Sequence, residues 1–179
     1  MSKQGQEHTK TDPVLDYALS VNVAEVIQAE PYHCWYNARD ALQQLPGRFL
    51  FSTYTEGWLV LSKQQVIQVI EHGWIRQAHG RVVDPSIILV EKSLSELVYF
   101  PGLLVPWSEM HALQGVPLPL AHLFSPGNDL GHPDYRAAYD EALAYAERCA
   151  SVSGRQVQLC PAQQITVACT KEGIIIVSE

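Results

Sequence analysis

The chain has 179 residues, and 47% of them are hydrophobic, which is enough to build the core of one domain. Its formal net charge is −7 with only 12 Lys and Arg residues, which argues against binding to a nucleic-acid backbone, since that requires a basic face. There is no basic amphipathic segment suited to a membrane surface. No stretch approaches the roughly 18 apolar residues of a transmembrane helix.

Residues 1–12 are polar and lack hydrophobic periodicity, so we expect them to be disordered. They contain no apolar signal region, and a cytoplasmic location is the expectation. The four cysteines (34, 149, 160 and 169) form no C-x-x-C pair, so neither a zinc site nor a disulfide framework is predicted. We predict no cofactor, and we expect residues 13–179 to form a single domain of undetermined oligomeric state.

The N-terminal half begins with two predicted helices. Apolar residues between 13 and 29 follow mostly helical spacing, with a break expected near residues 20–22, and Pro31 ends the segment. A second helix is predicted from Cys34 to Leu45. It ends at the Pro-Gly pair at 46–47 and presents one apolar face made of Trp35, Ala38, Leu42 and Leu45.

Strands are predicted next. Residues 48–55 alternate between apolar and polar side chains, Glu56-Gly57 is typical of a turn, and a strand follows at 58–61. The β-branched run that starts at Val66 predicts a strand reaching Arg76. A tight turn at 78–80 returns the chain through a strand at 81–84, which Pro85 ends. These two strands form the best-defined hairpin of the sequence.

The remainder mixes both kinds of element. The prediction is a strand at 87–90, a capping box at 93–96, an ordered apolar loop at 98–119, a helix at 134–150, and short strands at 156–159, 164–169 and 173–177. The sum of these elements is an α+β fold, in which the Cys34 helix packs on an antiparallel sheet and a C-terminal helix and extra strands are added.

Cys34, His72 and Asp84 follow one another in the chain and have the side chains needed to activate a thiol as a nucleophile. Cys34 opens a helix, where unpaired N–H groups stabilise a thiolate. An imidazole can take the thiol proton, and a carboxylate can fix the orientation and tautomer of that imidazole. With a turn at 78–80, His72 faces residues 84–86 across the hairpin, so His72 and Asp84 are predicted to lie side by side.

The motifs that carry these residues are Cys34-Trp35 at a helix start, His72-Gly73-Trp74 on a strand, and Asp84-Pro85 at the end of the next strand. In this order they resemble the transglutaminase-like core of the papain-like cysteine enzymes. The resemblance covers about residues 30–90. It implies a Cys-His-Asp triad that forms an acyl-enzyme with a protein, peptide or small-molecule amide or ester, as a peptidase or other hydrolase, a deamidase or an acyltransferase.

The resemblance also implies an oxyanion hole. The backbone N–H of Cys34 is the natural first donor, and Tyr32 or His33 is a candidate for the second, since the glutamine that papain-like enzymes carry before the cysteine is absent here. Three further residues are candidates for the cleft. Asn37 lies one turn after the thiol, Trp74 is a core or wall residue, and a carboxylate at Glu56 would line the cleft unless it only belongs to a turn.

Two alternatives stay open at this point. The fold could be a catalytically inactive protein-binding module that docks a partner through the apolar, proline-rich stretch at 98–120, with Tyr99, Phe100 and Trp107 as the working side chains. It could also be a small-molecule acyltransferase that resembles the arylamine acetyltransferases, which share the triad order.

Overall fold

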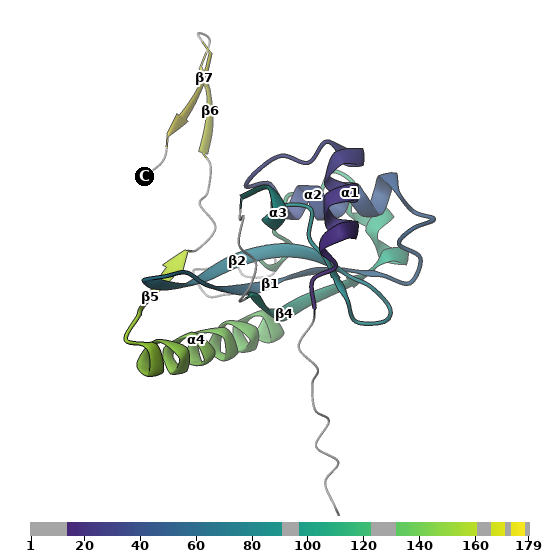
Figure 1. The fold of residues 1–179 in the computed structure, drawn as a ribbon. Coiled ribbons are helices and arrows are strands. Elements are labelled where there is room, and N and C mark those ends of the chain that lie inside the picture. The colour runs from purple at the N-terminus through teal and green to yellow at the C-terminus, as the bar shows by residue number, and fades with distance from the viewer. Residues whose placement is uncertain (1–13, 91–96, 123–131, 161–165, 171–172, 178–179) are drawn as a thin grey trace, which may run out of the picture.

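The structure is a computed structural model that describes residues 14–90, 97–122, 132–160, 166–170 and 173–177 (Figure 1). Over these residues the chain is a mixed α+β fold, as the sequence predicts. Within the described segments, no helix combines the length and the apolar character needed to cross a bilayer.

The main sheet has five strands, and strand β2 (Val66–Arg76) is its most connected member. On one side β2 pairs antiparallel with β1 (Thr53–Ser62), which in turn pairs antiparallel with β4 (Leu97–Pro106). On its other side β2 has two short partners, β3 (Val82–Val83) antiparallel and β5 (Gln156–Cys160) parallel. These two partners occupy different parts of the same edge.

Helices from the N-terminal half and from the C-terminal part of the chain pack on the sheet. Helix α4 (Pro133–Ser153) runs alongside β4. Helices α1 (Tyr17–Ile27), α2 (Cys34–Gln44) and α3 (Ile87–Val90) lie together near one end of β2 (Figure 1). The remaining elements are the 3-10 helices η1 (Trp107–Leu113) and η2 (Leu120–His122) and the hairpin of β6 (Thr166–Thr170) and β7 (Gly173–Val177).

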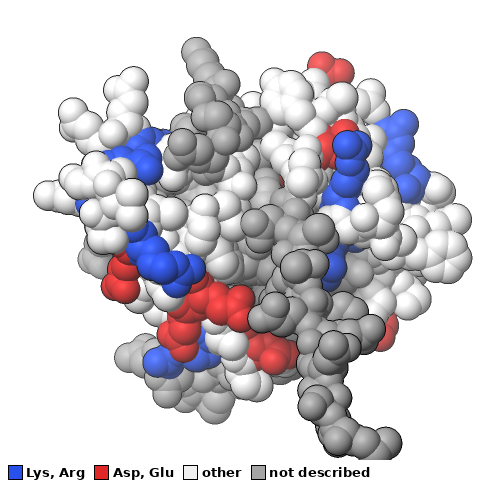
Figure 2. Space-filling model, turned by 60° about the horizontal axis from the view of Figure 1, so that its bottom comes forward, with Lys and Arg blue, Asp and Glu red and all other residues white. Residues whose placement is uncertain are grey.

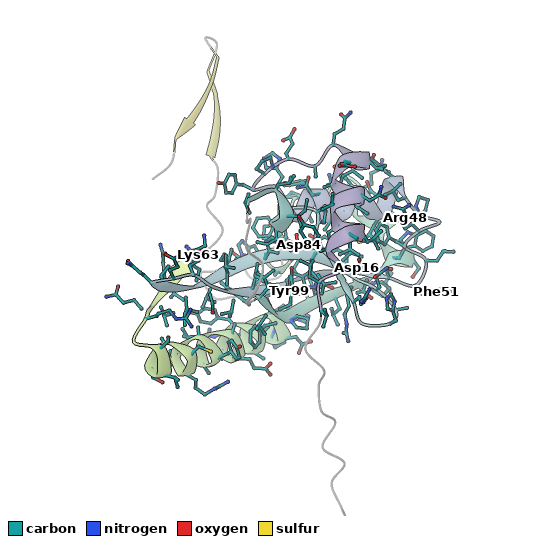
Figure 3. All side chains as sticks on the ribbon, viewed as in Figure 1. Asp16, Arg48, Phe51, Lys63, Asp84 and Tyr99 are labelled. Atoms are coloured by element: carbon teal, nitrogen blue, oxygen red, sulfur yellow. The ribbon has the colours of Figure 1, made fainter. Side chains whose placement is uncertain are left out.

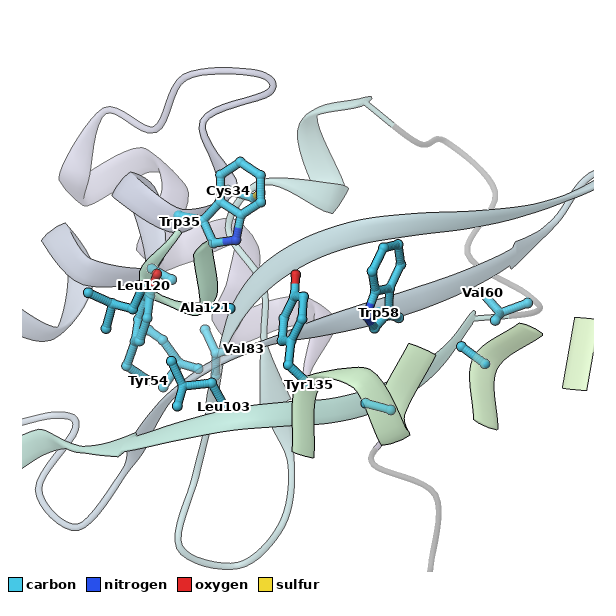
Figure 4. Packing of buried hydrophobic residues seen from close by; sticks show 14 of the residues in the cluster. Cys34, Trp35, Tyr54, Trp58, Val60, Val83, Leu103, Leu120, Ala121 and Tyr135 are labelled. Atoms are coloured by element: carbon cyan, nitrogen blue, oxygen red, sulfur yellow. The ribbon is translucent and has the colours of Figure 1, made fainter. Parts of the chain in front are cut away.

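Side-chain alternation gives the sheet two apolar faces. The larger core lies between the sheet and helices α2 and α4, and Figure 4 shows Trp35, Tyr54, Trp58 and Tyr135 among its packed side chains. The smaller core lies on the opposite face and is formed by Leu59, Trp74, Val82, Ile87 and Tyr99. His72 is adjacent in sequence to Glu71, so the two side chains point to opposite faces of β2.

The helix at Cys34 and the strand from Val66 to Arg76 are confirmed, and α1 is continuous across the predicted break. The predicted strand at 48–55 is correct only from Thr53, where β1 begins, because residues 46–51 form turns and a bend. Glu56-Gly57 is not a turn but the centre of β1. A β-bulge between these two residues in the pairing with β4 allows the strand to continue.

Two further predictions are corrected. Residues 97–106 form strand β4 rather than a loop. Among the described strands β4 pairs only with β1, so its prolines interrupt no ladder with a described strand on its other side. Residues 87–90 form the short helix α3 rather than a strand. Both N–H groups at its start, those of Ser86 and Ile87, donate to Asp84 Oδ1, which caps a helical turn. The capping box at 93–96 and residues 1–12 lie outside the described residues.

Candidate active site

Cys34 is the first residue of α2, and this helix begins at a gap in the edge of β2. On that edge β5 pairs with residues 66–70 and β3 with residues 75–76. Within the described chain, residues 71–74 therefore pair with β1 on the other edge but with no strand on this one. Gly73 lies in the gap against Trp35, where a Cβ atom would stand 3.0 Å from the Trp35 Cα. The absence of a side chain at 73 therefore allows the start of α2 to approach the strand.

His72 and Asp84 form a buried pair, as the hairpin register predicts. The distance between His72 Nε2 and Asp84 Oδ2 is 2.7 Å. His72 is 6% exposed and Asp84 is fully buried. Because Nε2 is engaged with the carboxylate, Nδ1 is the ring nitrogen that remains for another partner.

The thiol of Cys34 acts on the pKa of this imidazole. Burial lowers the pKa of His72, but the charges and hydrogen bonds of Asp84 and Cys34 outweigh burial, so the pKa of the imidazole lies well above its usual value. Within the described residues, no side chain caps the N-terminus of α2, so its first-turn N–H groups face the region of the thiol.

Asp84 is held by several donors. Its Oδ1 accepts the N–H groups of Ser86 and Ile87 at 3.1 and 3.0 Å, and its Oδ2 accepts the Tyr99 hydroxyl at 3.0 Å as well as the His72 ring. The backbone N–H of Asp84 donates to Ser20 Oγ in α1 at 2.9 Å. The carboxylate is therefore fixed from three elements of the fold. We call Cys34, His72, Asp84 and Tyr99 the triad cluster.

Asn37 connects α2, the helix that begins at Cys34, to the segment that follows Asp84. Its side-chain amide donates to Ser86 Oγ at 2.8 Å and to the Glu30 carbonyl at 2.7 Å, and its Oδ1 accepts the Glu30 N–H at 3.1 Å. Its side chain is thus occupied on both sides and is 6% exposed as a residue. Asn37 fixes the position of α2 relative to Asp84.

The other sequence candidates lie around the thiol in different environments. Trp74 is fully buried and stacks on His72 with ring centroids 6.3 Å apart, so it forms a wall behind the imidazole. Tyr32 has a positive φ of 65° and is 77% exposed. His33 precedes the thiol, and its Nδ1 lies 2.9 Å from Glu30 Oε2. The oxyanion role of Tyr32 or His33 stays a prediction.

Glu56 belongs to a second group of buried polar side chains on the face of the sheet opposite His72. Its Oε1 accepts the Tyr54 hydroxyl and the Leu120 N–H, both at 2.7 Å, and its Oε2 accepts the Ala121 N–H at 2.8 Å. Burial and the charge of Glu71 raise the pKa of Glu56 against these hydrogen bonds, which lower it. The carboxylate therefore anchors the segment that contains residues 120–121.

Glu71 is the second carboxylate of this group. Its Oε1 accepts the Tyr135 hydroxyl at 2.6 Å and lies 2.5 Å from His122 Nε2. The hydrogen bond to Glu71 raises the pKa of His122. We call Tyr54, Glu56, Glu71, His122 and Tyr135 the carboxylate cluster. Charge on Cys34 acts on the pKa of both tyrosines, so the thiol lies within electrostatic reach of this cluster as well.

Tyr99, Phe100 and Trp107, the side chains proposed for a docking surface, point inward. Tyr99 is 2% exposed, the Phe100 ring packs on Tyr145 with centroids 5.6 Å apart, and the Trp107 indole donates to the Leu42 carbonyl at 3.2 Å. These contacts give no support to docking through the three aromatic residues. On the face shown in Figure 2, described Lys and Arg side chains are interspersed with Asp and Glu side chains and with larger uncharged areas.

The sequence did not predict the residues that support Asp84. Tyr99, Ser20 and Ser86 each act through one hydrogen bond to Asp84, and no local pattern reveals such a bond. Among the described side chains, no group of three or more His, Cys, Asp or Glu residues has the arrangement of a metal site. The side chains of Cys34, Cys149 and Cys160 are free thiols.

Comparisons of the chain with protein-family models, with curated proteins and with solved structures found no match. The proposed chemistry of the site therefore rests on its own residues and their geometry. In that geometry the His72 imidazole is bound to a buried carboxylate, and the Cys34 thiol at the start of α2 acts on the pKa of His72.

Proposed function

We propose that the protein is a thiol-dependent enzyme with a papain-like or transglutaminase-like core, acting on an amide or ester carbonyl through an acyl-enzyme. The observation that carries the proposal is the His72 imidazole, which is bound through Nε2 to Asp84 and interacts with the Cys34 thiol. Asp84 has no solvent exposure, so it can orient the ring without competition from water.

The proposed reaction follows from these positions. His72 takes the thiol proton, and the Cys34 sulfur forms a bond to the carbonyl carbon. The C–N or C–O bond of the substrate then breaks, and the departing amine or alcohol leaves with the proton from His72. Water or an amine next attacks the acyl-enzyme, His72 accepts its proton, and the proton returns to the sulfur as the thiol is released.

The start of α2 supplies the matching electrostatics. N–H groups in the first turn, beginning with that of Cys34, are proposed to stabilise the negative oxygen of the tetrahedral intermediate. The choice of acceptor separates a peptidase, amidase or deamidase from an acyltransferase. All of these activities use the same first half-reaction.

Selective alkylation tests the proposal. Wild-type protein is treated with iodoacetamide at pH 7, and adducts on each cysteine are quantified by mass spectrometry. An ordinary thiol is about 3% ionised at this pH, so we expect Cys34 to react at least about tenfold faster per accessible thiol than Cys149 in unfolded protein.

The variants His72→Gln and Asp84→Asn should lower the Cys34 rate toward that of an ordinary thiol while Cys149 keeps its rate. Circular dichroism confirms that each variant is folded. A Cys34 rate that equals the ordinary thiol rate, or that is unchanged in folded His72→Gln, contradicts the proposal.

A further inference from the structure

Tyr99 shares the catalytic oxygen of Asp84 with His72. The Tyr99 hydroxyl donates to Asp84 Oδ2 at 3.0 Å, and His72 Nε2 lies 2.7 Å from the same atom. The other oxygen, Oδ1, is taken by two backbone N–H groups. The carboxylate thus has two donors on each oxygen in a site closed to solvent, and Tyr99 is the only side-chain donor besides His72 recorded among the described residues.

The position of Tyr99 is set by packing. It projects from β4, two strands away from β2, and its ring contacts Trp74 with centroids 5.1 Å apart. Trp74 in turn stacks on His72. Figure 3 shows Tyr99 and Asp84 on the part of the sheet next to α3. The tyrosine ring therefore cannot move away from the carboxylate without disturbing the wall behind the imidazole.

A hydrogen bond to an ionised carboxylate stabilises its negative charge and lowers its affinity for a proton. Here the donor acts on the atom that also holds the imidazole. Each donor on Oδ2 reduces the electron density available to the other, so the Tyr99 hydroxyl weakens the hold of Asp84 on a protonated His72.

We propose that Tyr99 is a positioning residue of the triad, whose hydroxyl limits how strongly Asp84 retains the proton on His72. The proposal rests on the triad mechanism given above. An imidazole that holds its proton too strongly is a poor donor to the leaving group, so the shared oxygen keeps His72 able both to accept and to release a proton.

The groups that act on His72 come from each element packed against it. They are the Cys34 thiol of α2, the Asp84 carboxylate after β3 and, behind that carboxylate, the Tyr99 hydroxyl of β4. Glu71, the chain neighbour of His72, points to the opposite face, where it binds His122 and Tyr135. In the Cys34→Ala protein, Asp84 is the group that acts directly on the pKa of His72, and Tyr99 acts on it through Asp84.

The carboxylate cluster supplies a matched control. Glu71 Oε1 is shared by a histidine ring and a tyrosine hydroxyl in the same way, through His122 and Tyr135. A Tyr→Phe change at either position removes one hydroxyl and keeps the ring. Each change should affect its own histidine and leave the other unchanged.

The experiment measures the imidazole pKa values by nitrogen-15 NMR in the Cys34→Ala protein. Tyr99→Phe should raise the pKa of His72 by about one unit, which is a tenfold gain in proton affinity. Tyr135→Phe should raise the pKa of His122 and leave His72 unchanged. An unchanged or lower pKa of His72 in folded Tyr99→Phe would overturn the proposal.

Two further measurements keep the outcome decisive. Site-specific replacement of Tyr99 with a fluorinated tyrosine preserves the bulk and makes the hydroxyl a stronger donor, so the pKa of His72 should fall; a rise or no change would again overturn the proposal. The alkylation rate of Cys34 in the otherwise wild-type chain is the separate test of the enzyme proposal. An unreactive Cys34 together with the expected His72 shifts would reject the enzyme and retain the role of Tyr99 toward Asp84.

Discussion

The two faces of the sheet carry the same three groups in the same arrangement, with different surroundings. On one face Asp84 Oδ2 is shared by His72 and Tyr99, and on the other Glu71 Oε1 is shared by His122 and Tyr135. The side chain of His72 is 8% exposed and its ring also interacts with a thiol, whereas the side chain of His122 is 38% exposed.

The two clusters differ in what surrounds the histidine and the carboxylate. In the triad cluster the second ring nitrogen is available to Cys34, and the carboxylate caps the chain that leads into α3. In the carboxylate cluster, the neighbouring Glu56 is used to hold the backbone of residues 120–121. Under the proposed mechanism, the thiol of Cys34 beside His72 is what distinguishes the triad cluster from the carboxylate cluster.

Gly73→Ala should produce the largest change, and it should act on the triad cluster first. The added Cβ would lie 2.6 Å from Trp35 Cδ1 and 3.0 Å from the Trp35 backbone, so α2 must shift away from β2. Overpacking of this kind costs about 3 kcal/mol. Urea denaturation should show this loss, and iodoacetamide should react more slowly with Cys34. Gly47→Ala, where the nearest atoms lie beyond 4 Å, should leave both measurements nearly unchanged.

Glu56→Gln should have a smaller effect, confined to the carboxylate cluster. An amide offers one acceptor oxygen where the carboxylate uses two, so either the Leu120 or the Ala121 N–H loses its partner. The expected loss of stability is about 2 kcal/mol, with faster hydrogen exchange at residues 120–122. The alkylation rate of Cys34 should stay within about threefold of wild type, because Asp84 and His72 keep their contacts. A collapse of thiol reactivity in folded Glu56→Gln would show that the two clusters act as one.

The dependence of stability on pH should give the smallest effect and should distinguish the two histidines. In the folded protein the pKa of His72 is raised above its usual value of about 6.5, so the stability it adds is complete below that pH and is lost as the pH rises through the raised value. Urea denaturation of wild type and His72→Gln from pH 6 to pH 10 should therefore show a difference that shrinks with rising pH.

His122→Gln should follow the same sign with a smaller amplitude, because solvent screens the more exposed pair of His122 and Glu71. Taking the difference from wild type cancels the titration of groups common to both proteins. A difference that grows with pH would mean that His72 is neutral in the folded protein.

The sequence predicted the His72–Asp84 pair and the helix start at Cys34 because these features depend on local patterns. The turn at 78–80 and the alternation of the two strands bring His72 and Asp84 together, and the helical spacing after Cys34 defines the start of α2. Each of these signals extends over a few residues. The α+β class follows from the same patterns.

The supports of the site depend on contacts between distant segments, which local patterns do not encode. The backbone groups that donate to Glu56, those of Leu120 and Ala121, lie 64 and 65 residues away. Because Glu-Gly is typical of a turn, the place of Glu56 in the centre of β1 was not predicted. The prolines of β4 concealed the strand that carries Tyr99. Gly102 lies in the β-bulge of β4, where a Cβ would stand 2.8 Å from the Tyr135 Cα. The absence of a side chain at this position therefore also lets α4 approach β4.

The two clusters differ in how much of the chain must exist before they can form. Every member of the triad cluster has been synthesised by residue 99, together with Ser20, which holds Asp84. The carboxylate cluster needs residues 120–122 and Tyr135, and the edge of β2 next to His72 is covered only when β5 emerges at residues 156–160. A chain that leaves the ribosome N-terminus first thus has Cys34, His72 and Asp84 before it has the groups that bind Glu56 and Glu71. Nascent chains of increasing length should acquire Cys34 reactivity and resistance to proteolysis at separate points of translation.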